Sequence, residues 1–167
     1  FKESNPKVIE ELIPDVLSLG KIQKVLQNLL KEQVSIRDLR TILEQLADYG
    51  PTTKDTDILT EYVRQAMARP ITKQFQSEDG SLSVMTLGRD VEEIILNSVQ
   101  KTEVSSFLAL EPTIAEKLLV NLQEAVEVMT PKLETSPVLL ASPGIRHHLR
   151  KFVERFLPDL AVLSHSE

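Results

Sequence analysis

Cysteine and tryptophan are both absent from this chain of 167 residues. Without cysteine the chain has no disulfide framework, no thiolate metal site and no thiol nucleophile. Aromatic residues make up 4% of the sequence, which leaves few platforms on which bases or sugars could stack. The 5 glycines offer little backbone for cradling phosphates, and no Walker loop, G-x-G-x-x-G or G-x-S-x-G motif occurs. The sequence therefore predicts neither an enzyme nor a bound cofactor.

Long apolar runs and an excess of basic residues are missing as well. No run of about 18 apolar residues exists, so we expect no membrane-spanning helix, and the polar N-terminus does not resemble a signal peptide. The formal net charge of −6 argues against general nucleic-acid binding. An apolar fraction of 41% is ordinary for one globular domain or two small ones. A first residue that is not methionine suggests a fragment of a longer protein.

The clearest pattern lies between Leu19 and Gly50 and predicts two packed helices. Ser35 is placed to cap the second helix by accepting a hydrogen bond from a first-turn N–H. The negative charge of Asp38 would stabilise the first turn by its interaction with the helix dipole. Gly50 is expected to adopt a left-handed cap, and Pro51 to prevent continuation. The apolar residues recur at helical spacing in two stripes, Ile22, Leu26, Leu29 and Leu30, and then Ile36, Leu39, Ile42, Leu43, Leu46 and Ala47.

Residues 1–75 are predicted to form a helical subdomain around this pair. Asn5 and Pro6 open a short helix. Asp55 or Thr56 caps a later helix, which Pro70 should terminate. Because apolar residues continue at the same spacing beyond Pro70, a kinked continuation and a strand both remain open.

Residues 76–167 change in pattern and predict a small α/β subdomain. A polar turn at 76–80 precedes a short β-rich run at 82–87, and 107–110 is ambiguous, with an extended edge as one option. A long helix is expected at 112–129. A strand at 137–141, a helix that starts at Ser142–Pro143 and a strand at 160–163 form a βαβ unit, whose strands should be parallel. Two further sets are expected to face inward, Val91, Ile94, Ile95 and Val99 from a helix starting at Asp90, and Ile145, Leu149, Phe152, Val153 and Phe156 from the βαβ helix.

The fold class predicted is thus mixed α and α/β, with a helical subdomain followed by a small α/β subdomain whose short sheet is at least partly parallel. The boundary is expected between residues 75 and 76.

A basic run inside this acidic chain is the most distinctive charge feature. Arg146, Arg150 and Lys151 should give one helix a basic face, and backbone N–H groups at 142–144 could hold an anion. A solvated face, a docking surface for an acidic partner, and phosphate or nucleic-acid binding all remain open. The neighbouring His147 and His148 point about 100° apart on a helix and have no cysteine or carboxylate at ligand spacing, so we expect no metal site.

Two segments resemble a known family. Residues 22–49 read IQKVLQNLLKEQVSIRDLRTILEQLADY, and residues 59–69 read LTEYVRQAMAR. LALEPTIAEKLL from Leu108 and PVLLASPGIRHHLRKFVERFLPDLAVLS from Pro137 agree more loosely. Together they resemble the FHIPEP family, the large export-gate proteins of type III secretion, which serve bacterial flagella and virulence injectisomes. The residues in these segments resemble the flagellar members more than the injectisome members.

The resemblance implies a role in protein export. The full protein would carry a multi-helix membrane domain, and its cytosolic domain would form a nonameric ring at the cytoplasmic face of the bacterial inner membrane. That ring would receive export chaperone–substrate complexes and components of the export ATPase complex. This chain would hold the third and fourth cytosolic subdomains, with no cofactor, no nucleic-acid partner and no membrane contact of its own.

No catalytic, metal-binding or cofactor-binding residue is predicted, so the candidate site is a protein interface. The polar side of the helix predicted at 35–48 is expected to contact a neighbouring subunit or subdomain; equally open is that its charges are solvated or pair within the chain. An alternative function is an acidic α/β regulatory or interaction domain whose basic helix binds an anionic partner. The candidate interface residues are Arg37, Asp38, Arg40, Glu44, Arg146, Arg150 and Lys151.

Overall fold

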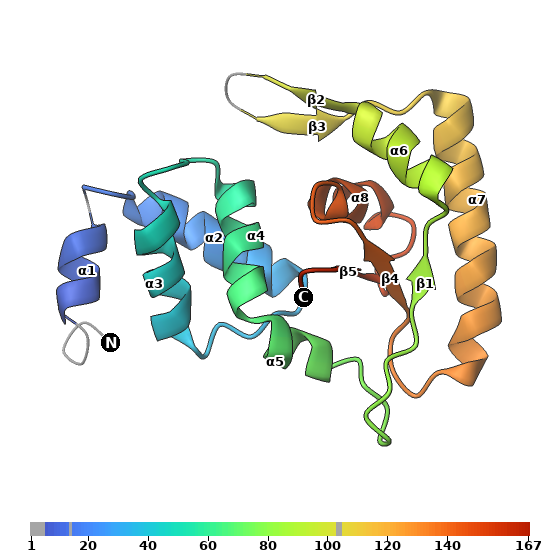
Figure 1. The fold of residues 1–167 in the computed structure, drawn as a ribbon, viewed down its shortest axis with the longest axis horizontal. Helices are drawn as coiled ribbons and strands as arrows, with labels where there is room; N and C mark the ends of the chain where they lie inside the picture. Colours follow the sequence, from blue (N-terminus) through green and yellow to red (C-terminus); the bar gives the residue numbers. More distant parts are fainter. Residues whose placement is uncertain (1–5, 14, 103–104) are drawn as a thin grey trace. The chain divides into compact units, whose positions relative to one another are not determined.

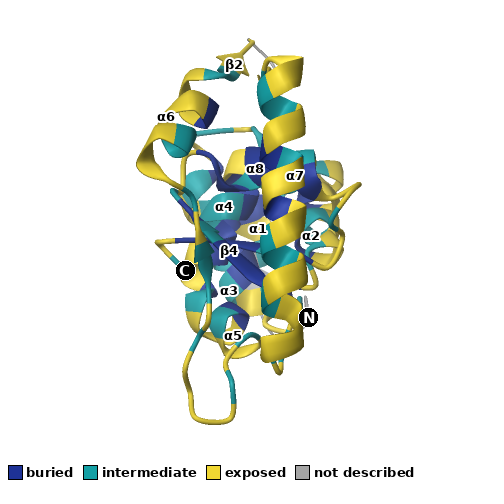
Figure 2. Cartoon of the chain, turned by 90° about the vertical axis from the view of Figure 1, so that its right-hand side faces the viewer, coloured by how far each residue is buried: buried dark blue, intermediate teal, exposed yellow. Residues whose placement is uncertain are grey.

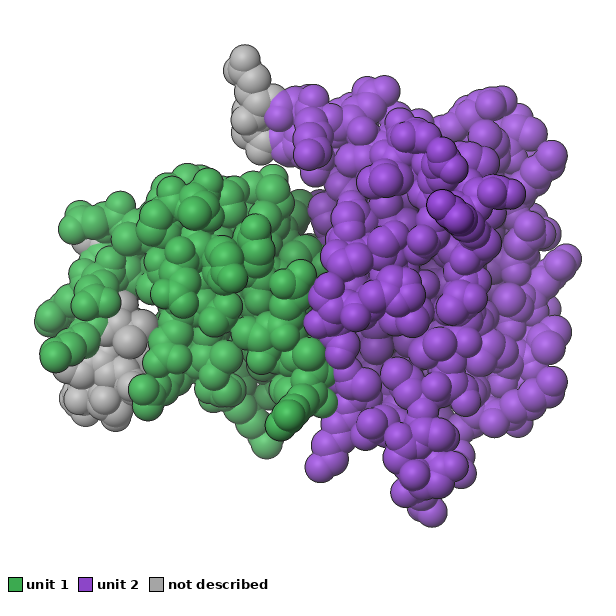
Figure 3. Space-filling view, in the orientation of Figure 1, with its two compact units in different colours: residues 1–71 green, residues 72–167 purple. Residues whose placement is uncertain are grey.

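The computed structural model describes residues 6–13, 15–102 and 105–167. The chain divides into two compact units, residues 1–71 and residues 72–167 (Figure 3). From the sequence we expected the division between residues 75 and 76. In the described ranges, each helix is too short or too polar to cross a lipid bilayer.

The first unit is built from helices (Figure 1). Asn5, expected to help open the first helix, lies outside the described residues. The core consists of the inward sides of the helices, where side chains such as Leu12, Leu29, Ile42 and Leu46 are fully buried. The elements are α1 (Pro6–Leu12), α2 (Leu19–Lys31), α3 (Leu39–Tyr49), α4 (Thr56–Ala66) and α5 (Ala68–Lys73), the last of which crosses the boundary between the units.

The predicted helix pair is confirmed as α2 and α3, but its capping differs from the prediction. The N-cap of α3 is Asp38, not Ser35. The Asp38 carboxylate accepts hydrogen bonds from the Thr41 N–H at 3.2 Å and the Thr41 hydroxyl at 2.7 Å. Ser35 Oγ accepts from the Arg37 N–H in the segment that precedes the helix. Because Asp38 holds first-turn donors so well, the helix begins at Leu39 and Arg37 lies outside it.

Gly50 does not adopt the left-handed conformation that we expected. Its φ of −55° and ψ of −35° are right-handed and open to any residue. The glycine is needed for space instead, since an added Cβ would lie 2.6 Å from Val16 Cγ1 and 3.2 Å from Leu17 Cγ. The end of α3 thus approaches the segment before α2 more closely than a side chain permits.

The helix beyond residue 55 is capped and bent largely as predicted. Asp55 caps α4, with its Oδ1 accepting from the Asp57 N–H at 2.8 Å. The chain then continues as α5, so the kinked continuation is confirmed and the strand alternative is wrong. The break falls at Met67, which places Pro70 in the first turn of α5, where its missing N–H costs no hydrogen bond.

The second unit combines a small sheet with helices (Figures 1 and 2). Its described residues contain a 3-stranded parallel sheet in the order β1-β4-β5 and an antiparallel β2–β3 pair. Leu139, in the central strand, pairs with Met85 on one side and Val162 on the other. The elements are β1 (Met85–Thr86), α6 (Arg89–Asn97), β2 (Val99–Lys101), β3 (Ser106–Leu108), α7 (Pro112–Met129), the 3₁₀ turn η1 (Thr130–Lys132), β4 (Val138–Ala141), α8 (Arg146–Val153) and β5 (Ala161–Ser164).

This architecture confirms the mixed fold class and the parallel strands of the βαβ unit. The bounds of α7 agree with the prediction. The core joins the sheet to one side of each helix, with Ile95, Leu122, Leu139 and Leu149 among its members. Figure 2 shows the opposite side of α7 as largely exposed.

Several local predictions in the second unit are wrong. The run at 82–87 forms only the two-residue strand β1. Val99 is not on the inward side of a helix but in β2, because α6 ends at Asn97 with Ser98 as its C-cap. Ile94 is 40% exposed, and Phe156 is 64% exposed because α8 ends at Val153.

Candidate protein interaction surfaces

Four of the predicted interface residues lie just before α3 or in its first half, and we call them the α3 surface: Arg37, Asp38, Arg40 and Glu44. Arg37, Asp38 and Arg40 are exposed. Arg40 Nε donates to Glu44 Oε1 at 2.8 Å, with 69% and 43% of the two side chains exposed. The hydrogen bond to Glu44 raises the pKa of Arg40, which is charged at any physiological pH. A pair this exposed is screened by water and salt, so a partner can displace it at little cost.

Asp38 differs from its neighbours because it also supports the fold. The side-chain and backbone hydrogen bonds from Thr41 lower the pKa of the Asp38 carboxyl below 3.8. The ionised form is therefore stabilised in the folded state. Asp38 contributes stability that is present above the pKa of the unfolded chain and is lost as the pH falls through the lower folded pKa.

Replacing Asp38 by alanine should lower the free energy of unfolding by about 1 kcal/mol at neutral pH, because two donors at the start of α3 lose their acceptor. The difference between the wild type and the variant should shrink as the pH falls below 3.8. Urea unfolding followed by circular dichroism across this range checks both points. Asp48→Ala, at an exposed position of the same helix, serves as control. A pH-independent difference would contradict this role of the carboxylate.

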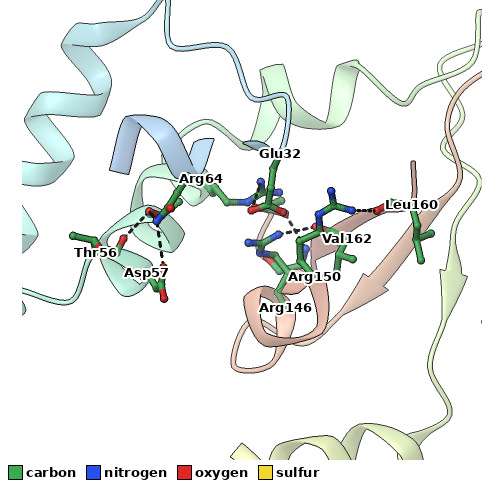
Figure 4. A network of polar contacts seen from close by, with 12 residues as sticks. Glu32, Thr56, Asp57, Arg64, Arg146, Arg150, Leu160 and Val162 are labelled. Carbon is green, nitrogen blue, oxygen red and sulfur yellow. Dashed lines mark hydrogen bonds and ion pairs between the residues drawn. The ribbon is translucent and has the colours of Figure 1, made fainter. Parts of the chain in front are cut away.

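The basic residues of α8 do not share one solvated face, contrary to the prediction. Arg146 is 1% exposed, and its Nη1 donates to Val162 O at 2.9 Å (Figure 4). Arg150 is half-buried, and its Nη1 donates to Leu160 O at 2.7 Å. Lys151 is exposed. Arginine behaves in this way because its planar group carries several donors in a rigid fork and is weakly hydrated.

These contacts close one edge of the sheet. β5 pairs with β4 through alternate residues, as in the bonds Ala161 N–H to Pro137 O and His165 N–H to Ala141 O. Val162 therefore points its carbonyl to the other edge, where Arg146 binds it. Next along that edge, the Ser164 N–H donates to Glu167 Oε2 at 2.9 Å. Charged side chains placed in this way prevent further strands from adding to the sheet.

The sequence did contain a signal for the burial of Arg146. Arg146, Leu149, Arg150 and Val153 follow the i, i+3, i+4, i+7 spacing of one helix side. Leu149 and Val153 are fully buried on that side. A basic residue on an apolar stripe therefore indicates an arginine that binds backbone carbonyls inside the fold.

At the start of α8, where the sequence left anion binding open, the chain itself supplies the anionic group. The Ser142 N–H donates to Glu92 Oε1 at 3.0 Å, so a carboxylate of α6 takes the place of an external anion. With Arg146 buried as well, the alternative of a basic helix that binds an anionic partner has lost its main support.

The two neighbouring histidines pack within the fold. Their ring centroids lie 3.8 Å apart, and His148 is 4% exposed with Nε2 3.4 Å from Ser106 Oγ of β3. Across the described residues, no group of three or more His, Cys, Asp or Glu side chains is arranged to hold a metal ion.

Exposed apolar side chains are a further surface feature that the sequence did not predict. Leu30 was expected on the buried stripe of α2 but is 53% exposed, and Leu19 is 68% exposed. On a helix, Leu30 lies about 100° from the fully buried Leu29 and cannot share its side. α2 thus presents leucines to solvent as well as to the core.

The model of the FHIPEP family matches residues 1–167 of the chain. The chain belongs to the FHIPEP family. It is 49% identical over 167 residues to the flagellar biosynthesis protein FlhA of Bacillus subtilis, covering 100% of this chain and 24% of that protein. It is 34% identical over 161 residues to the low calcium response locus protein D of Yersinia pestis, covering 96% of this chain and 22% of that protein. The chain thus spans about a quarter of the length of the curated relatives that it matches.

Solved structures of FHIPEP relatives share the fold. The Chlamydia pneumoniae CdsV protein has a TM-score of 0.87 at 36% identity, over 99% of this chain and 47% of that one. The nonameric EPEC SctV-C has a TM-score of 0.85 at 34% identity, over 99% and 49%. A chain in the structure of the C. pneumoniae CdsV and CdsO complex has a TM-score of 0.86 at 33% identity. The match covers 99% of this chain and 48% of that one.

These findings confirm the family that the two motifs indicated. The relatives are flagellar and secretion proteins, which agrees with the expectation that the chain is not an enzyme. A nonamer and a complex with another protein occur among the structures of those relatives.

Proposed function

We propose that the chain is part of the cytosolic docking and ring portion of a flagellar type III export gate. The observation that carries the proposal is the family match over the whole chain, together with a higher identity to FlhA of B. subtilis, 49%, than to the Y. pestis protein, 34%. The two compact units would be the third and fourth cytosolic subdomains of a longer protein. A membrane domain elsewhere in that protein would hold them at the cytoplasmic face of the inner membrane.

In this function the chain contributes ring contacts and receives partners. Its relative SctV-C is nonameric, and its relative CdsV was solved with CdsO, which supports contacts both with copies of the chain and with other components of the apparatus. Export chaperone–substrate complexes and components of the export ATPase complex are the partners that we propose. Chaperones and their cargo would dock largely on parts of the protein that precede this chain.

We place the ring contact at the α3 surface. Arg37 and Arg40 are exposed, and the Arg40 side chain pairs with Glu44, which a partner can displace. On α8, by contrast, Arg146 and Arg150 bind backbone carbonyls of their own unit, so of the predicted residues there Lys151 is the best placed to meet a partner.

Charge reversal at Arg37 and Arg40 should impair ring assembly and flagellar export while the fold survives. Both side chains are exposed, so the melting temperature should stay within the range of ordinary surface substitutions. Swimming motility of a strain that produces the full-length Arg37→Glu/Arg40→Glu protein reports export, and mass photometry of its cytosolic domain reports assembly. Lys101→Glu/Lys132→Glu, at exposed positions of the second unit, makes the same charge change as a control. Normal motility and normal assembly of the Arg37→Glu/Arg40→Glu variant would contradict a ring contact at the α3 surface.

A further inference from the structure

The two tyrosines of the chain lie against each other in the first unit. They are Tyr49, the last residue of α3, and Tyr62, in α4, and the sequence contains 2 tyrosines in all. Their ring centroids are 3.9 Å apart, and the ring planes differ by 3°. Aromatic pairs in proteins prefer offset or edge-to-face arrangements with centroids roughly 4.5–7 Å apart. The Tyr49–Tyr62 pair is therefore closer than most, and its rings are almost parallel.

The backbone holds both members of the pair in place. The Tyr49 carbonyl accepts hydrogen bonds from the Thr52 N–H at 3.0 Å and from the Thr52 hydroxyl at 2.7 Å. Tyr62 precedes the fully buried Val63, and α3 and α4 pack side by side (Figure 1). Both tyrosines are half-buried. The two rings are thus held close to each other while each remains partly open to solvent.

The composition of the chain directs one-electron oxidation to this pair. Cysteine and tryptophan, the side chains that compete most strongly with tyrosine for the loss of one electron, are both absent. The 3 methionines are oxidised by a different reaction, the addition of an oxygen atom to give the sulfoxide. A tyrosyl radical in this chain therefore forms at Tyr49 or Tyr62, directly beside a second phenol.

We propose that Tyr49 and Tyr62 are a site of oxidative modification, at which a one-electron oxidant joins the two rings as dityrosine. The cross-link needs two equivalents of the oxidant. Each phenol gives one electron to an oxidant molecule and its hydroxyl proton to water, which leaves two phenoxyl radicals. The product has two hydrogen atoms fewer than the two tyrosines.

The stacked geometry suits the bond that forms. The unpaired electron of a phenoxyl radical lies in the π system, with density on the Cε carbons next to the carbon that bears the oxygen. Because the Tyr49 and Tyr62 rings are parallel and stacked, the π lobes of each ring point at the other. The two unpaired electrons then form a bond between one Cε of each ring. The hydrogens on these two carbons move to the oxygens, which restores both aromatic rings.

The cross-link would fix the end of α3 to α4. It closes a loop between residues 49 and 62 and restricts the unfolded chain as a disulfide would, in a chain that has no cysteine. We expect it to raise the melting temperature of the first unit by about 5 °C or more. This inference goes beyond the proposed function because it concerns a covalent change within one unit. It requires neither a partner nor the α3 surface.

The test exposes the dilute 167-residue chain to tris(bipyridyl)ruthenium(III), generated by light with persulfate as the final electron acceptor. The expected product is a monomer that has lost two hydrogen atoms by intact mass spectrometry and shows dityrosine fluorescence. After proteolysis, the peptide containing Tyr49 should be joined to the peptide containing Tyr62. Circular dichroism then measures the melting temperature of the cross-linked product.

Three controls separate the stacked pair from chance encounters. Tyr49→Phe and Tyr62→Phe each keep two aromatic rings but remove one phenol, and circular dichroism should show them folded. Each should lower the yield of the internal cross-link by about tenfold or more, and so should unfolding of the wild type in urea, because the phenols are then no longer held together. Equal yields from folded and unfolded wild type would overturn the proposal. So would cross-linked dimers as the main product, or oxidation confined to methionine.

Discussion

Replacing Arg146 by methionine is expected to lower the free energy of unfolding by about 2 to 4 kcal/mol. The guanidinium is 1% exposed and donates to Val162 O at 2.9 Å. Methionine keeps much of the apolar stem but leaves a carbonyl at the β5 edge without this donor. Guanidinium chloride unfolding of the wild type and the variant, followed by circular dichroism, measures the loss.

The matched control for this prediction is Arg155→Met, which makes the same chemical change at an exposed position just beyond α8. It should alter the free energy of unfolding by less than about 0.5 kcal/mol. If Arg146→Met were as stable as Arg155→Met, Arg146 would not hold the β5 edge, and its place among the interface residues would have to be reconsidered.

Gly50→Ala should lower the free energy of unfolding by about 1 to 3 kcal/mol, although alanine is the better helix former. The backbone of Gly50 is right-handed, so the cost does not arise from its φ. It arises because the new Cβ would lie 2.6 Å from Val16 Cγ1 and 2.5 Å from Leu46 O, and the backbone oxygen cannot rotate away. Thermal unfolding by circular dichroism is a sufficient measurement.

Gly20→Ala is the control for Gly50, since Gly20 lies in the first turn of α2 and an added Cβ there would meet nothing within 4 Å. That substitution should raise stability by up to about 1 kcal/mol. If Gly50→Ala raised stability as Gly20→Ala is expected to, the segment before α2 would move aside for the new Cβ at little cost. That result would contradict the close packing described above.

Local signals account for the parts of the fold that were predicted. The apolar stripes of α2 and α3, the Pro112 start of α7 and the Asp55 cap of α4 all depend on residues within a few positions of one another. The strands β4 and β5 were found because their apolar runs are flanked by turn residues. The β2–β3 pair escaped prediction because Val99–Lys101 is three residues long and its pattern continues that of the preceding helix.

Non-local packing explains what could not be predicted. Gly50 looks like a helix stop in the sequence, and only its distance to Val16 shows that the glycine is there for space. Arg37 and Arg146 are alike as residue types, yet one is exposed and the other is 1% exposed against the β5 edge. Leu30 is apolar and was assigned to the core, whereas its side of α2 faces solvent. Charge and hydropathy therefore indicate which residues could lie at the surface. Whether such a residue is exposed or buried in the fold depends on tertiary contacts that the local sequence does not show.

The central claim is that the α3 surface serves assembly whereas the α8 arginines serve the fold. The most direct test measures the melting temperature and the ring assembly of the same cytosolic domain carrying either Arg37→Glu/Arg40→Glu or Arg146→Met. The account predicts an unchanged melting temperature with reduced assembly for the first variant, and a lowered melting temperature for the second. A first variant that assembles normally, or that loses as much stability as the second, would contradict it.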